Sequence, residues 1–132
     1  MRFLGIDYGS KRIGTALSDE GGTLAFPKKV IPNGENIFPE LDAIIKKENV
    51  SEIVVGESID FSGKPNAIAE EIETFIFRLQ SKFGLPVHNQ KEFLTSVEAR
   101  RYQGGGQVDA SAAALILQRY LDRRNKQGLR KA

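Results

Sequence analysis

The sequence predicts one α/β domain built on a mixed five-stranded sheet with helices on its faces. Three apolar segments, at residues 3–7, 13–18 and 23–30, follow one another across short turns, which is typical of an antiparallel meander. After residue 36, helical and strand patterns alternate, which favours parallel pairing of the later strands. The predicted order is therefore βββαβαβαα, with the first three strands antiparallel and the fourth and fifth parallel.

Hydrophobic spacing defines the first elements after the meander. Ile37, Leu41 and Ile44 recur at helical spacing and predict a helix that ends near Asn49. The β-branched run at 53–56 is typical of a buried parallel strand, and we expect a polar loop at 57–66 to follow it.

The second half of the chain repeats this alternation. Apolar residues from Ile68 to Phe83 predict a long amphipathic helix, which Gly84 ends in the C′ position. Three further segments are predicted: a weak strand at 85–88, a short helix at 94–102 and a last helix from Asp109 to about Arg124. Residues 1–124 would form the domain, and 125–132 a basic tail.

The composition narrows the chemistry that the chain can perform. With no cysteine and one histidine, thiolate sites and histidine-rich zinc sites are excluded. A metal site would therefore consist of carboxylates and water, which favours Mg²⁺ or Mn²⁺. No apolar run approaches the roughly 20 residues that span a membrane, and the N-terminus shows no signal peptide. We therefore expect a cytoplasmic protein without a membrane partner.

Charge is unevenly distributed, although the net charge is only +2. From Arg119 to the C-terminus the sequence contains six basic residues and one acidic residue, Asp122. Such a segment suits a polyanionic partner, and it also fits an ordinary solvated C-terminus.

Four carboxylates fall at the ends of predicted elements. Asp7 ends the first strand, Glu57 follows the fourth, Glu92 follows the fifth, and Asp109 opens the last helix. Two-metal phosphodiester hydrolysis needs carboxylates from separate elements around cations about 3.5–4 Å apart. Each acid also has an ordinary interpretation: Asp7 as an Asx-turn, Asp109 as an N-cap, and the two Glu as solvated loop residues.

Several polar and basic residues are candidates for binding a substrate phosphate. They are Ser10, Lys11 and Arg12 in the first turn, and Arg100 and Arg101 on the predicted short helix. Phosphate contacts position a nucleic acid without reading its sequence. Ordinary turn residues and a plain surface helix explain the same pattern.

Residues 5–14, Gly-Ile-Asp-Tyr-Gly-Ser-Lys-Arg-Ile-Gly, resemble the opening motif of the YqgF/RuvX family. Segments 53–56, 94–99 and 108–118 are similar to later family motifs in the same order, so the resemblance extends from residue 2 to about 122. It implies a ribonuclease H-like fold. It also implies a metal-dependent endonuclease for structured nucleic acid, either a four-way DNA junction or a precursor of small-subunit ribosomal RNA.

The resemblance implies a metal cage of Asp7, Asp109 and one Glu, binding Mg²⁺ or Mn²⁺. Glu57 is our preferred third metal ligand, because the related resolvase RuvC carries a Glu at the end of its fourth strand. Glu92 matches the acid of the YqgF/RuvX family itself and joins the catalytic set. Around both acids the family pattern changes: Glu57-Ser58 replaces an apolar-Pro pair, and Lys91-Glu92-Phe93 replaces Asp-Glu-Arg.

Two other functions fit parts of the sequence. Because the residues around Glu57 and Glu92 depart from the family, a non-catalytic RNA- or ribosome-binding module is the main alternative. Residues 5–10 also resemble the phosphate-binding hairpin of actin and sugar kinases, which enclose ATP between two such domains. A four-way junction has two-fold symmetry, so a junction resolvase would be expected to act as a homodimer.

Overall fold

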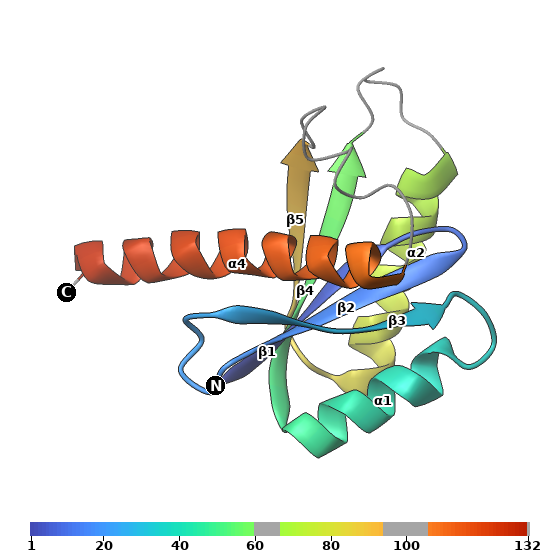
Figure 1. Cartoon of the computed structure of the whole chain (residues 1–132), viewed down its shortest axis with the longest axis horizontal. Coiled ribbons are helices and arrows are strands. Elements are labelled where there is room, and N and C mark those ends of the chain that lie inside the picture. Colours follow the sequence, from blue (N-terminus) through green and yellow to red (C-terminus); the bar gives the residue numbers. More distant parts are fainter. Residues whose placement is uncertain (60–66, 94–105, 132) are drawn as a thin grey trace.

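The centre of the molecule is a five-stranded mixed sheet in the order β3-β2-β1-β4-β5 (Figure 1). The computed structural model describes residues 1–59, 67–93 and 106–131. The strands are β1 (Arg2–Tyr8), β2 (Arg12–Ser18), β3 (Ala25–Pro32), β4 (Val50–Ile59) and β5 (Val87–Phe93). β1, β2 and β3 pair antiparallel, whereas β4 pairs parallel with both β1 and β5. This pairing confirms the predicted mixed sheet.

Helices cover both faces of the sheet. α1 (Ile37–Glu48) and α2 (Ala67–Phe83) lie on one face, and α4 (Gly106–Lys131) crosses the other (Figure 1). Leu4 and Ile6 of β1 belong to the core under α1 and α2, whereas Phe3 belongs to the core under α4. Because alternate strand residues point to opposite faces, Asp7 belongs to the α4 face. No helix in the described ranges is long and apolar enough to cross a membrane.

The ends of α1 and α2 confirm the sequence-based boundaries. Asn49 has φ 53° and ψ 51° in the left-handed region, and its N–H donates to the Ile45 carbonyl oxygen. Gly84 has φ 65° and donates its N–H to the Gln80 carbonyl oxygen at 3.0 Å. Both residues adopt the conformation that commonly ends a helix.

The fourth and fifth strands are longer than predicted. Glu57 lies within β4 instead of a polar loop, and Glu92 lies within β5 instead of after it. Residues 57–59 of β4 pair with residues 91–93 of β5 in parallel register. Hydrogen bonding between two neighbouring segments extends both strands, and the apolar pattern of either segment alone does not reveal it.

The last helix also differs from the prediction at both ends. It begins at Gly106, so Asp109 lies inside the first turn and is not the N-cap residue. It continues to Lys131 instead of ending near Arg124. The residues after Asn125 carry little apolar pattern, and such a pattern is what marks a helix in a sequence. The predicted helix at 94–102 and residues 103–105 of the predicted glycine loop lie outside the described residues.

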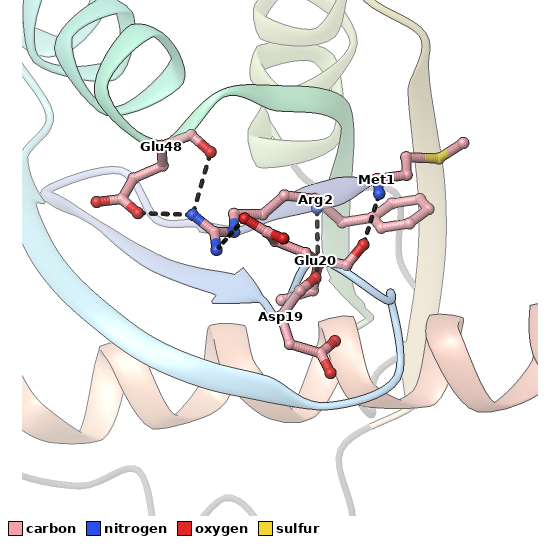
Figure 2. Close-up of polar contacts among 7 residues, drawn as sticks. Met1, Arg2, Asp19, Glu20 and Glu48 are labelled. Carbon is pink, nitrogen blue, oxygen red and sulfur yellow. Dashed lines mark hydrogen bonds and ion pairs between the residues drawn. The ribbon is translucent and has the colours of Figure 1, made fainter.

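Polar contacts fasten the start of β1 (Figure 2). The Arg2 guanidinium donates to Oε2 of Glu48 at 3.0 Å and to the Glu48 carbonyl oxygen at 3.2 Å, and lies 3.7 Å from Glu20. The Met1 amine donates to the Glu20 carbonyl oxygen, and the Phe3 N–H donates to Ser18 Oγ at 2.8 Å. These contacts tie β1 to the end of α1 and to the β2–β3 turn, at the opposite end of the strand from Asp7.

Candidate active site

Asp7 lies near the C-terminal end of β1, between two glycines on the neighbouring strands. It pairs with Gly14 of β2 and with Gly56 of β4. The residue is half-buried. Because Gly56 carries no side chain, α4 approaches this part of the sheet closely, and Ile116 occupies the space over Gly56.

Close packing of α4 depends on two glycines on this face. A Cβ built at Gly5 would lie 2.8 Å from Cβ of Leu117 and 3.1 Å from the Ala113 carbonyl oxygen. A Cβ at Gly56 would lie 2.3 Å from Cδ1 of Ile116. Real Cβ atoms do not approach other atoms so closely, so α4 reaches this depth only because both positions are glycine.

The contacts between β1 and α4 show that the two elements run antiparallel. Arg124 lies over the Phe3 ring with 5.1 Å from Cζ to the ring centroid, and the Tyr120 and Phe3 ring centroids are 5.9 Å apart. Two residues further along β1, Gly5 lies against Leu117 and Ala113. Over these two strand residues the contacted positions of α4 shift by seven, from 120 and 124 to 113 and 117, which is about two helix turns. Asp7, two residues beyond Gly5, therefore lies toward the N-terminal end of α4, and Asp109 falls in the first turn of that helix.

The strand register separates the two candidate Glu positions. Gly56 pairs with both Asp7 and Gln90, whereas Glu57 pairs with Lys91 and Ser58 with Glu92. Because successive residues of a strand belong to opposite faces of the sheet, positions 56 and 58 share one face and position 57 belongs to the other. Since Gly56 lies under α4, positions 7, 56, 58 and 92 share the α4 face, and position 57 belongs to the face of α1 and α2.

Only part of the proposed metal cage falls within the described side chains. The structure describes the Asp7 side chain. At positions 57, 92 and 109 it describes the backbone but not the side chain, so these positions are assigned from the backbone alone. Among the side chains that are described, no three His, Cys, Asp or Glu residues gather as a metal site. The strand register assigns positions 7 and 92 to the α4 face, and Asp109 lies in the first turn of α4 itself.

The turn between β1 and β2 presents the predicted phosphate-binding residues. Ser10, Lys11 and Arg12 are all exposed. Asn33 Nδ2 donates to the Gly9 carbonyl oxygen at 2.9 Å, and the Asn33 N–H donates to the Lys11 carbonyl oxygen at 3.0 Å. These bonds hold the turn against the loop after β3, just beyond Asp7. Arg100 and Arg101 lie outside the described residues.

A cavity on the opposite face has no counterpart in the sequence-based predictions. It has a volume of about 800 Å³ and lies between the end of β1, α1 and α2, with Tyr8, Phe38, Phe75 and Arg78 among its lining residues. The Tyr8 hydroxyl donates to Glu71 Oε2 at 3.4 Å. Tyr8 follows Asp7 and therefore belongs to the other face of the sheet, so this cavity is separate from the carboxylate edge.

A second cluster that the sequence did not reveal joins β4, β5 and α4. His88 Nε2 lies 3.0 Å from Glu52 Oε1, and the His88 ring stacks on Tyr120 with 5.1 Å between centroids. Burial, followed by the negative charge of Glu52, raises the pKa of the Tyr120 hydroxyl. The cluster holds the middle of α4 against β5, because residues from all three elements contact one another.

The mixed sheet, the strand order and the acids at one end of its central strands define a ribonuclease H-like α/β protein. The chain matches the family model described as "RuvX: Holliday junction resolvase" over residues 1–123. The chain therefore belongs to the RuvX family.

Relatives of similar length support this membership. A protein of Nitratidesulfovibrio vulgaris named "Putative pre-16S rRNA nuclease" is 38% identical, covering 92% of this chain and 94% of its own length. A protein of the same name from Halothermothrix orenii is 36% identical, covering 96% of this chain and 98% of its own. Family membership and these names place the chain among the nucleases.

Solved structures confirm the fold. Thermus thermophilus RuvC in complex with a Holliday junction substrate superimposes with a TM-score of 0.60 at 13% identity, covering 94% of this chain and 95% of that one. Fowlpox virus resolvase, solved with Holliday junction DNA, gives a TM-score of 0.51 at 10% identity, covering 93% and 98%. At these identities the likeness establishes the ribonuclease H-like fold of this chain.

Proposed function

We propose that this protein is a metal-dependent endonuclease that cuts structured nucleic acid at the carboxylate edge of β1. The observation that supports the proposal is the close packing of α4 on Gly5 and Gly56, which brings the N-terminal half of α4 to the face of the sheet on which Asp7 lies. In this proposal Asp7, Asp109 and Glu92 form the metal cage. Glu57, one residue out of register with that face, is outside the cage.

The donor set fits Mg²⁺ or Mn²⁺, because these cations prefer oxygen ligands and the candidate residues are all carboxylates. Bound divalent ions would activate the attacking water and stabilise the leaving oxygen. The protein's own residues hold the site together: the glycines set the depth of α4, and the half-buried Asp7 offers its carboxylate on a rigid strand. Lys11 and Arg12 in the adjoining turn would bind a phosphate of the substrate.

Two substrates fit this site. The relatives are named for precursor 16S ribosomal RNA, and the family description and the solved resolvases refer to Holliday junctions. Both present a phosphodiester backbone in a branched or folded context. If the junction is the substrate, cutting two symmetry-related strands calls for a homodimer.

A cleavage assay tests the proposal. The protein is incubated with Mg²⁺ or Mn²⁺ and either a 5′-extended 16S ribosomal RNA fragment or a four-way DNA junction. We expect metal-dependent cutting of at least one substrate, its loss in Asp7→Asn, and equal or tighter binding by that variant, because a negative charge near the phosphates is removed. Asp42→Asn on α1, across the sheet, is the matched control and should cut normally.

The opposite result is equally clear. Binding of RNA by the wild-type protein without cutting under either metal would contradict the nuclease and support the non-catalytic RNA-binding module. Cutting that survives Asp7→Asn would show that the activity lies outside the carboxylate edge.

A further inference from the structure

We propose that one face of α4 is a docking surface for the phosphate backbone of the substrate, at a distance from the scissile phosphate. The surface, called here the α4 basic stripe, consists of Arg119, Arg123 and Lys126. The inference takes its substrate class from the proposed function and adds where, and over what length, a nucleic acid contacts this chain.

The charge distribution is the first observation. Residues 119–131 contain six cations and one acid and so carry +5, and since the chain totals +2, the remainder carries −3. A basic segment on an otherwise acidic protein concentrates the attraction for a polyanion on one element. The mild net charge of the whole chain conceals this asymmetry.

The helical register is the second observation. Arg119, Arg123 and Lys126 are spaced by four and three residues, and the spacing continues by four to Arg130. Residues three or four apart share one face of a helix. The opposite face packs on the sheet through Leu117 and Leu121, which are fully buried, whereas Arg123 and Lys126 are exposed. The basic residues thus form a line that faces away from the sheet.

The helix is held rigidly where the stripe begins. Gln118 accepts the Ala25 N–H and donates to the Thr23 carbonyl oxygen, each at 2.9 Å. Further along α4, Asn125 Nδ2 donates to the Gly22 carbonyl oxygen at 3.0 Å. These bonds fasten α4 to the β2–β3 turn on both sides of Arg123. The stripe is therefore presented by a fixed helix, and its end projects beyond the strands (Figure 1).

The distance from the active site sets the length of substrate that is needed. Asp109 and Arg123 are separated by roughly 21 Å along the helix at about 1.5 Å per residue. A duplex that starts at the carboxylate edge covers that distance in about six base pairs, at about 3.4 Å per phosphate of one strand. The stripe therefore contacts substrates only when a flank of that length continues past the cleavage point.

The stripe consists of arginine and lysine. Tyr120 is the one aromatic residue at positions 119–127, and it is partly buried. Contacts of this kind neutralise phosphates and read no sequence. Their signature is a steep salt dependence of binding, because each neutralised phosphate of a duplex contributes about 0.9 to the slope of log affinity against log salt.

The test compares Arg123→Gln/Lys126→Gln with Lys46→Gln/Lys47→Gln, a double variant on α1 that removes the same charge from the other face of the sheet. Affinity is measured in EDTA, without cleavage, over a salt series for an RNA hairpin and a four-way DNA junction. Each is made with arms of about 4 or about 12 base pairs, on either side of the length that reaches Arg123. Thermal unfolding of both variants confirms that they fold.

We expect the α4 variant to lower the salt slope by about 1.8 and the affinity near 0.1 M salt by tens of fold, for long arms only. The α1 control should leave both unchanged. Equal slopes for the α4 variant and the wild type, or a loss that does not depend on arm length, would overturn the stripe. Because the assay needs no cleavage, an inactive protein that still binds through the stripe would reject the nuclease and keep this inference.

Discussion

At the scale of single residues, the glycines matter as much as the acids. Asp7 has Gly14 and Gly56 beside it, and Gly5 and Gly56 admit α4 to contact distance. The four candidate acids were chosen from the sequence by their order along the chain and by the family resemblance, and their roles stay predictions. The role of Gly5 and Gly56 could not be predicted from the sequence, since it depends on atoms of Ala113, Ile116 and Leu117 that are more than fifty residues away along the chain.

Adding one methyl group at Gly5 tests this role. Gly5→Ala places Cβ against Cβ of Leu117 and the Ala113 carbonyl oxygen, and a backbone atom cannot move aside cheaply. We expect the free energy of unfolding to fall by about 1–3 kcal/mol, as for other overpacked cores. Urea unfolding measures the change.

Gly34→Ala is the matched control for that experiment. No atom lies within 4 Å of a Cβ built at Gly34. Its free energy of unfolding should therefore stay within about 0.5 kcal/mol of the wild type. If the two alanine variants are equally stable, α4 does not depend on Gly5 for its close approach.

At the scale of elements, the sequence located helices and strands well where an apolar pattern or a glycine marks them. The sequence-based prediction was wrong where pairing with a neighbouring strand, and not the apolar pattern, determines how far a strand extends. The β4 and β5 ends hold each other in register from Glu57 to Ile59, which converts an expected loop into strand. The start of α4 at Gly106 was missed because a glycine-rich segment carries no helical pattern, and this changes Asp109 from a cap residue to a residue of the first turn.

The end of α1 offers a test at this scale. Asn49 occupies the left-handed region. This conformation costs an ordinary L-residue about 1–2 kcal/mol of conformational energy, whereas glycine adopts it without steric strain. We expect Asn49→Ala to lower the free energy of unfolding by about 1 kcal/mol and Asn49→Gly to leave it unchanged or raise it. Thermal or urea unfolding distinguishes the two.

Asn36, at the other end of α1, serves as the control. It occupies the N-cap position but makes no side-chain capping hydrogen bond. Asn36→Ala should therefore cost less than the roughly 1 kcal/mol typical of a lost cap. A larger loss at Asn36 than at Asn49 would contradict this description of the helix ends.

At the scale of the whole molecule, the two faces of the sheet differ in what covers them. The face under α1 and α2 holds the larger core and a cavity of about 800 Å³. The face under α4 carries the acid edge at one end of the helix and positive charge at the other. A single long helix thereby connects the proposed cleavage site with the proposed docking surface, and its packing on β1 fixes the distance between them.

The most direct test of the central claim measures single-turnover cleavage by four variants in Mn²⁺: Asp7→Asn, Glu92→Gln, Asp109→Asn and Glu57→Gln. In our proposal the first three residues form the metal cage, whereas the strand register assigns position 57 to the other face of the sheet. We predict that the first three each lose roughly 100-fold or more in rate while retaining binding, and that Glu57→Gln stays within a few-fold of the wild type. A large loss in Glu57→Gln with little change in Glu92→Gln would contradict the site that the strand register defines.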